Sequence, residues 1–304
     1  PTYGGDDFKV AKEAGVPAIL VKDENGKEVP TVDRTGRFVE EITDFAGRFV
    51  KEEYYSAEER ADKDFRPTDV LIAIKLKEDN KAFDVKKYEH TYPHCWRTDK
   101  PVLYYPLDSW FIKTTAVKEK LVELNKTINW KPESTGTGRF GNWLENLVDW
   151  NLSRSRYWGT PLPIWRTEDE NEEVCIGSMA ELKGLLEASL TSDILSAEEK
   201  AVNKEYLDKF GSDKLDLHRP YVDHIVLVSE SGQKMFREPD LIDVWFDSGA
   251  MPYAQWGLDY DKLAAGDPLP FKADYDSAFP ADFIAEGVDQ TRGWFFTLHA
   301  ISTM

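Results

Sequence analysis

Apolar and polar positions along the first third of the chain predict both strands and helices. Two short apolar runs in residues 16–32 flank an Asn25-Gly26 pair, which favours a tight turn, so this segment predicts a hairpin. Apolar residues at helical spacing predict a helix over residues 38–53. The apolar run at residues 69–76 (DVLIAIKL) predicts a strand.

The middle of the chain predicts a second group of elements. Apolar positions that share one stripe predict a helix over residues 117–128. Residues 166–215 are acidic and predict two helices, the second of which begins with a capping box formed by Ser196 and Glu199. Residues 222–238 predict a further hairpin.

The last segment predicts a strand, a turn and a helix in succession. Residues 279–285 (FPADFIA) predict a buried strand, Glu286 and Gly287 a turn, and residues 289–304 a helix. This corner is where α/β folds commonly bind nucleotides, so the fold class expected is α/β. The last helix shows no stop signal before the sequence ends, so we expect the chain to be a piece of a longer protein.

Composition and charge narrow the class of protein. Hydrophobic residues make up 41% of the 304 residues and aromatic residues 13%, enough for a packed core. No apolar run reaches the roughly 18–20 residues needed to cross a bilayer, so no membrane role is expected. Two cysteines cannot form a disulfide framework, which favours a reducing, cytoplasmic setting. The summed net charge of −18 argues against binding of nucleic acid, although the distribution of the charges matters more for such binding than their sum.

The residues from Glu286 to Trp294 are the first candidate site. Asp289 and Gln290 open the predicted helix, where their side chains can bond ribose hydroxyls or an ammonium group. Trp294 falls one turn beyond Gln290 on the same face. The alternative is that Asp289 only caps the helix and that Trp294 is a core residue.

Two further clusters are candidates from the residues alone. Asp243 and Asp247 flank Trp245 and are spaced as paired carboxylates for glycoside hydrolysis, or are solvated acids beside a core tryptophan. Arg154 and Arg156 alternate with serines ahead of two aromatic residues. That pattern suits phosphate contacts and base stacking, or a solvated face. Arginines gather around these segments: Arg139, Arg154, Arg156 and Arg292.

Metal-binding signals are weak. Neither a CxxC pair nor an H-E-x-x-H motif is present, and His94 directly precedes Cys95, a poor spacing for joint ligation. We therefore expect no metal site, and ordinary buried thiols at Cys95 and Cys175.

Several long motifs together resemble the isoleucyl-tRNA synthetase family of class I. They are PTYGGDDF, YPHCWRTDKPVLYYPLDSWFI, WNLSRSRYWGTPLPIW, DVWFDSGAMPYAQW and FPADFIAEGVDQTRGWFFTLHAIS. The resemblance implies a Rossmann catalytic domain interrupted by an editing insertion. It further implies activation of isoleucine with ATP and Mg²⁺, transfer to tRNA(Ile) and hydrolytic editing of valyl-tRNA(Ile). Valyl and leucyl relatives share part of these motifs, but EGVDQTRGWF is the isoleucyl version.

The resemblance also implies a division of the chain into four parts. These are the end of the editing domain (1–92), a return into the catalytic domain (93–160), a second connective insertion (161–240) and the truncated second half of the Rossmann domain (241–304).

Site residues follow from the matched motifs. Contacts to the aminoacyl-adenylate are implied for Glu286, Gly287, Asp289 and Gln290, and aromatic walls of the isoleucine pocket for Trp245 and Trp294. Asp7, flanked by Asp6, matches the acid that holds the ammonium group of misattached valine. Arg154 and Arg156 remain candidates for tRNA phosphate.

The chain departs from the family pattern at the positions of two zinc knuckles. Thr98 stands where a zinc knuckle would need a second cysteine. Residues 167 and 170, and 229 and 231, stand where a second knuckle would need its pairs. We therefore expect no zinc site, and expect the hairpin at 222–238 to be held by packing alone.

The family's H-I-G-H and K-M-S-K-S motifs are absent from the sequence given. We therefore expect this chain alone not to aminoacylate. We also expect it to bind tRNA weakly or not at all, because a synthetase of this family would bind tRNA partly through other domains. The alternatives are a valyl- or leucyl-type synthetase, an editing deacylase and a carbohydrate-active protein.

Overall fold

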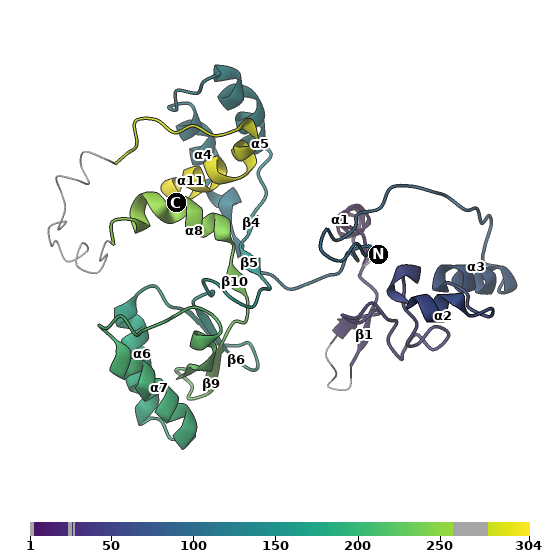
Figure 1. Ribbon diagram of the computed structural model, residues 1–304, viewed down its shortest axis with the longest axis horizontal. Helices are drawn as coiled ribbons and strands as arrows, with labels where there is room; N and C mark the ends of the chain where they lie inside the picture. Colours follow the sequence, from purple (N-terminus) through teal and green to yellow (C-terminus); the bar gives the residue numbers. More distant parts are fainter. Residues whose placement is uncertain (1–2, 24–25, 27, 258–278) are drawn as a thin grey trace. The chain divides into compact units, whose positions relative to one another are not determined.

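The structure is a computed structural model that describes residues 3–23, 26, 28–257 and 279–304. The chain separates into two compact units, Pro1–Asp108 and Ser109–Met304, and each is described by itself (Figure 1). The four-part division expected from the sequence stays a prediction.

The first unit combines short helices with one hairpin. Its elements are α1 (Gly5–Glu13), β1 (Leu20–Lys22), β2 (Glu28–Pro30), η1 (Glu52–Tyr54), α2 (Ala57–Ala61) and α3 (Thr68–Glu78). Strands β1 and β2 are antiparallel, with Val21 opposite Val29, so the predicted hairpin is confirmed. Asn25 of its predicted turn lies outside the described residues, whereas Gly26 adopts the positive φ of 78° that favours glycine.

The helix predicted over residues 38–53 is wrong. This segment instead makes successive tight turns, in which Ile42 N–H donates to Val39 O at 3.0 Å and Phe45 N–H to Ile42 O at 2.9 Å. Gly47, with a φ of 71°, reverses the chain and donates to Phe38 O. Repeated turns place apolar residues every third position, so their spacing mimics a helix.

The strand predicted over residues 69–76 is also wrong, because these residues form α3. A continuous apolar run cannot separate a buried strand from a buried helix by periodicity. The charges favour the helix, since Asp69 lies in its first turn and Lys75 and Lys77 in its last, complementing the helix dipole. Thr68 fixes the start of α3 by donating to Phe49 O at 2.6 Å.

The second unit contains a mainly helical part that carries the candidate site. Its helices are η2 (Thr114–Val117), α4 (Lys118–Asn125), the π-helix η3 (Thr135–Phe140), α5 (Gly141–Glu145), α8 (Val244–Ala254), η5 (Val288–Arg292) and α11 (Trp294–Thr303). Two short antiparallel pairs join it, β3 (Phe111–Ile112) with β4 (Trp150–Asn151) and β5 (Ser153–Arg154) with β10 (Leu241–Ile242). The helix predicted over 117–128 is confirmed as α4.

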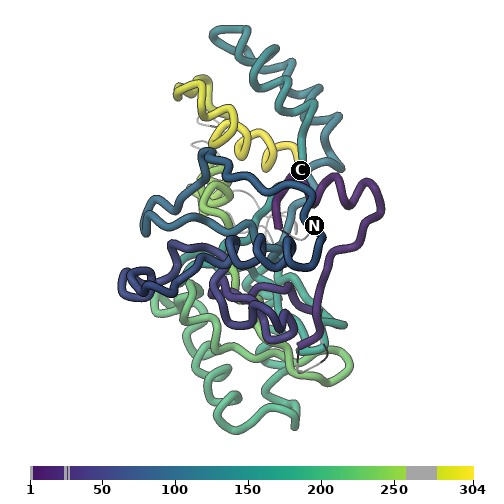
Figure 2. The backbone as a smooth tube through the Cα atoms, turned by 90° about the vertical axis from the view of Figure 1, so that its right-hand side faces the viewer, coloured from purple at the N-terminus to yellow at the C-terminus, as the bar shows by residue number. Residues whose placement is uncertain are grey.

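The core of this part is built around helices α4, α5 and α11. It includes Leu121, Phe140, Leu144, Leu147, Trp150, Phe296 and Ala300, each at most 8% exposed. Helix α11, the yellow C-terminal helix in Figures 1 and 2, lies against α8.

The remaining part of the second unit is a small α/β lobe. Four antiparallel strands lie in the order β7-β6-β9-β8: β7 (Glu173–Cys175), β6 (Ile164–Thr167), β9 (Lys234–Arg237) and β8 (Val226–Val228). Helices α6 (Met179–Thr191) and α7 (Ala197–Lys209) lie side by side (Figure 1), and η4 (Tyr221–His224) precedes β8. The capping box of Ser196 and Glu199 and the hairpin at 222–238 are both confirmed.

The strand predicted over residues 279–285 is wrong, since these residues form no regular element. No strand among the described residues pairs with them, and Phe283 remains 77% exposed. The final helix is also divided at Gly293 into η5 and α11.

The mixed α/β fold class is confirmed by the elements and by their short sheets. Every strand pair in the described part of the chain is antiparallel, so a parallel sheet is not formed there. No helix in this part is long and apolar enough to cross a membrane.

Candidate functional site

Helices α8 and α11 meet at Gly249, where their backbones come into close contact. A Cβ atom at Gly249 would lie 2.9 Å from the carbonyl carbon of Thr297 and 2.9 Å from Ile301 Cδ1. Only glycine permits this approach without displacement. Trp294 on α11 contacts α8 directly, because its Nε1 donates to Ser248 O at 3.2 Å. The other candidate tryptophan, Trp245, lies on α8.

Gln290 organises the polar turn that precedes α11. Its Oε1 accepts from Trp294 N–H at 3.1 Å, and its Nε2 donates to Asp289 Oδ2 at 3.0 Å. A Cβ atom at Gly293 would lie 2.7 Å from Gln290 Oε1 and 3.5 Å from Trp245 Cη2. Gln290, Trp245 and Trp294 therefore converge at Gly293.

The two alternatives posed for this turn are decided in part by these contacts. Gln290, not Asp289, accepts from the first N–H of α11, and Asp289 stays exposed together with Glu286 and Gly287. Trp294 is half-buried, and Trp245 is 41% exposed, so neither ring is sealed inside the core. The turn thus presents exposed acids beside two partly open indole rings.

Thr291 supports the turn from beneath. Its side chain is fully buried, its Oγ1 donates to Val288 O at 2.7 Å, and the same oxygen accepts from Arg139 Nε at 2.9 Å. The sequence marked Arg139 only as a candidate phosphate contact and did not mark Thr291. A buried polar residue inside an exposed polar turn gives no periodic signal, so the sequence offered no way to find it.

Asp243 is an anchor inside the fold. It is 4% exposed, and its Oδ1 caps α8 by accepting from Trp245 N–H at 3.2 Å. Its Oδ2 accepts from Trp150 Nε1 at 3.1 Å and from Arg154 Nη2 at 2.8 Å. With both oxygens occupied, Asp243 cannot serve as one of two paired catalytic acids, so the glycoside hydrolase interpretation is wrong.

Asp247 lies one turn further along α8. Burial raises the pKa of its carboxyl, and a hydrogen bond from Thr160 Oγ1 at 3.3 Å opposes that shift. Its environment is that of a half-buried structural acid next to Asp243.

The family of the chain follows from comparison with known proteins. Residues 21–304 match the family model described as tRNA synthetases class I (I, L, M and V). The chain belongs to this family.

Several similar proteins carry the name isoleucine–tRNA ligase. The chain is similar over its whole length to the isoleucine–tRNA ligases of Cytophaga hutchinsonii (64% identical), Bacteroides fragilis (54%) and Clostridium novyi (41%). It covers 26%, 27% and 24% of their respective lengths. The chain therefore spans about a quarter of the length of these relatives.

The two arginines marked in this class I synthetase chain differ in their surroundings. Arg154 is committed to Asp243 and also donates to Asn151 O at 2.9 Å. Arg156 is exposed, and its Nη1 donates to Ser155 O at 2.9 Å. Of the pair, Arg156 is the better placed to meet a phosphate group.

The acids of the predicted editing site lie in the first unit. Asp6 and Asp7 are exposed in the first turn of α1, which begins after Gly4. Gly4 has a φ of 113°, and a Cβ atom there would lie 2.9 Å from Asp7 Oδ2, so the carboxylate of Asp7 folds back over the start of the helix.

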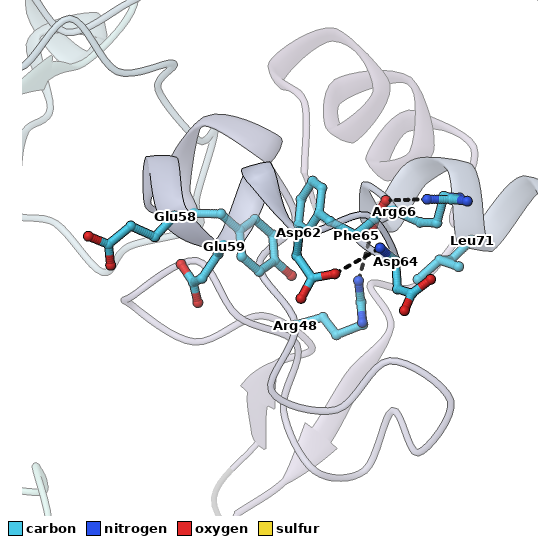
Figure 3. Close-up of a pocket in the computed structure, with 9 residues that line it drawn as sticks. Arg48, Glu58, Glu59, Asp62, Asp64, Phe65, Arg66 and Leu71 are labelled. Carbon is cyan, nitrogen blue, oxygen red and sulfur yellow. Dashed lines mark hydrogen bonds between the residues drawn. The ribbon is translucent and has the colours of Figure 1, made fainter.

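A separate open pocket of about 480 Å³ also lies in the first unit (Figure 3). It is lined by Arg48, Tyr55, Glu58, Glu59, Asp62, Asp64, Phe65, Arg66 and Leu71. Arg48 Nη2 closes one side by donating to Arg66 O at 2.8 Å. None of the site residues predicted from the sequence lines it.

The turn at the first predicted zinc-knuckle position is held by hydrogen bonds. Thr98 N–H and Asp99 N–H donate to Cys95 O, at 3.2 and 2.8 Å. The hydroxyl of Thr98 and neighbouring backbone N–H groups lower the pKa of the Cys95 thiol. Among the described residues no group of three or more His, Cys, Asp or Glu side chains is arranged to hold a metal ion.

Glu172 joins the two turns at the second knuckle position. Its carboxylate accepts from Ser229 Oγ at 3.0 Å, from Ser231 N–H at 3.3 Å and from the Ser231 hydroxyl. The expectation that packing alone holds the 222–238 hairpin is therefore wrong. The sequence did not reveal Glu172 because its partners lie 57 and 59 residues further along the chain.

Proposed function

We propose that a full-length synthetase carrying this segment is an isoleucine–tRNA ligase. It activates isoleucine with ATP to isoleucyl-adenylate, releases pyrophosphate, and transfers the isoleucyl group to tRNA(Ile). The observation that carries this proposal is 64% identity, over the whole chain, to a protein named isoleucine–tRNA ligase.

In this proposal the turn before α11 binds the polar part of the adenylate. Glu286 and Asp289 supply carboxylates for the ammonium group and the ribose hydroxyls, and Gly287 leaves the backbone open to close approach. Gln290 orients Asp289 through the bond at 3.0 Å while capping α11. Geometry in support is the convergence of Gln290 with Trp245 at Gly293.

Trp245 and Trp294 form the walls of the isoleucine pocket. Indole rings bury an aliphatic side chain, and the N–H of Trp294 is already bonded to Ser248 O, so the ring adds no unpaired donor. Such a pocket rejects valine weakly, because one methylene contributes only about 1–3 kcal/mol.

Hydrolytic editing of valyl-tRNA(Ile) compensates for that weak selectivity. Asp7 holds the ammonium group of the misattached valine, Asp6 flanks it, and a positioned water attacks the ester. The exposed carboxylate of Asp7 at the start of α1 suits this ionic role.

The remaining partners follow from the same reaction. ATP arrives with Mg²⁺, which the nucleotide phosphates would hold. Arg156 meets a tRNA phosphate, with Arg154 fixed by Asp243 behind it. The chain alone is expected to bind tRNA weakly or not at all, and to hold no zinc. The cytoplasm is the compartment where this reaction is needed.

Amino-acid-dependent exchange between ATP and pyrophosphate tests the proposed function. The full-length protein is expected to exchange with isoleucine about 10- to 200-fold more efficiently than with valine. The 304-residue chain alone is expected to show no exchange. Preference for valine or leucine would instead identify a relative of different specificity.

A further inference from the structure

The π-helix η3 holds Arg139 at a fixed place beside the adenylate-binding turn. A π-helix is rare and often marks a functional position. Gly136 within it accepts a hydrogen bond from Asn125 Nδ2 at 3.0 Å, and Asn125 Oδ1 in turn accepts from Trp130 Nε1 at 2.8 Å. A Cβ atom at Gly141 would lie 2.7 Å from Gly136 O, so the π turn closes tightly on the start of α5.

The next residue after Arg139 secures this arrangement in the core. Phe140 is fully buried, and its ring lies against Trp130 and His299, at centroid distances of 5.1 and 5.6 Å. The backbone of Arg139 is therefore fixed although its side chain is exposed. From this base its Nε reaches Thr291 Oγ1 at 2.9 Å, 152 residues further along the chain.

Thr291 relays this contact into the turn. It is fully buried, and its hydroxyl donates to Val288 O, the first residue of η5, while it accepts from Arg139. Asp289 and Gln290 lie between these two points. The hydroxyl thus closes η5 on itself, and Arg139 ties the closed turn to η3.

We propose that Arg139 is a positioning residue for amino-acid activation, acting through Thr291 on the conformation of the turn that bears Asp289 and Gln290. This inference rests on the proposed function. The Arg139–Thr291 contact (the brace) holds the segment that bears Asp289 and Gln290, the residues proposed to bind the polar part of the adenylate. It therefore affects groups that isoleucine and valine share, and not the selection between their side chains.

The test compares Arg139→Ala, Thr291→Val, Thr291→Ser and the Arg139→Ala/Thr291→Val double variant in the full-length protein. Arg139→Ala is expected to raise the KM for isoleucine about fivefold, as loss of one ordinary hydrogen bond implies. Thr291→Val also loses the bond to Val288 O and is expected to raise this KM by at least as much. The kcat per titrated active site stays within about twofold, and the ratio of isoleucine to valine activation is unchanged. Thr291→Ser keeps the hydroxyl and restores KM, and the double variant costs no more than Thr291→Val alone.

Thr137→Val is the matched control, since Thr137 lies exposed on the same π-helix and its hydroxyl contacts only Glu133 O, at 3.3 Å, among the described residues. A fall in kcat at unchanged KM, or additive effects of the two substitutions, overturns the proposal.

Hydrogen exchange separates this proposal from the proposed function. Arg139→Ala should accelerate amide exchange in residues 289–293, whereas Thr137→Val should not. If the wild-type protein shows no isoleucine-dependent exchange of pyrophosphate, the proposed function is wrong. If Arg139→Ala leaves amide protection in residues 289–293 unchanged, the positioning role of Arg139 is wrong, whatever the result of the first measurement.

Discussion

Contacts of single side chains separate anchors from residues free to meet a substrate. Asp243 and Asp289 are both acids at the start of a helix, yet Asp243 is buried with three bonded donors and Asp289 is exposed. The sequence indicated both acids as candidate site residues. It could not predict which acid is buried, because the partners Trp150 and Arg154 lie about 90 residues away.

Replacing Asp243 tests its role as an anchor. Asp243→Ala removes the helix cap and the partner of Arg154, and we expect a loss of about 2–3 kcal/mol of unfolding free energy. Asp243→Asn retains an oxygen for the cap and should lose only about 1 kcal/mol of unfolding free energy. The loss is small because Arg154, which is 38% exposed, can be solvated by water in place of the carboxylate. Chemical denaturation followed by tryptophan fluorescence measures both, and the exposed Asp213→Asn serves as control. An equal loss of unfolding free energy in all three variants would contradict the structural role of Asp243.

Packing between elements fixes the candidate site more than their individual propensities do. Helix α8 carries Trp245 and helix α11 carries Trp294, and the two approach as closely as Gly249 permits. The sequence predicted the last helix. It did not indicate that Gly249 faces α11, since a single glycine inside a helical segment has no distinctive pattern.

A methyl group at Gly249 should separate these helices. Gly249→Ala places Cβ 2.9 Å from backbone and side-chain atoms of Thr297, and we expect a destabilisation of about 1–3 kcal/mol. Gly184→Ala is the matched control, because no atom lies within 4 Å of its Cβ and it lies inside α6. That change should stabilise by about 0.5–1 kcal/mol. Thermal unfolding compares the two, and similar shifts in both would contradict the close contact.

The turns joined by Glu172 predict a pH dependence. Hydrogen bonds from Ser231, and then from Ser229, lower the pKa of Glu172 from its ordinary 4.5 despite opposing desolvation. A lowered pKa in the folded state means that the stabilisation is complete above pH 4.5 and is lost as the pH falls through the folded-state pKa.

Glu172→Gln should therefore lower Tm at neutral pH, and the gap to wild type should narrow as the pH falls below about 4.5. Glu168→Gln, an exposed neighbour in the same loop, should show no such gap. A gap for Glu172→Gln that stays constant with pH would show that the charge is not involved.

The sequence correctly predicted the elements that depend on residues close together in the chain. The Ser196 capping box and the hairpins at 16–32 and 222–238 are set by residues a few positions apart. The errors at 38–53 and 69–76 arose where one apolar spacing fits two structures, since repeated turns mimic a helix and a continuous apolar run fits either a strand or a helix. The strand predicted at 279–285 has no partner strand among the described residues.

The net charge of the whole chain was a poor guide to the family to which it belongs. The charge of −18 argued against nucleic acid, yet the chain belongs to the class I tRNA synthetases. Since the chain covers about a quarter of its relatives' length, its summed charge describes only part of the surface available to a partner.

The adenylate site is tested most directly by a crystal structure of the full-length protein with a non-hydrolysable isoleucyl-adenylate analogue. We predict the isoleucyl side chain between Trp245 and Trp294, and the polar groups within hydrogen-bond distance of Glu286, Asp289 and Gln290. Binding of the analogue at another place, with these residues free of it, would contradict the account.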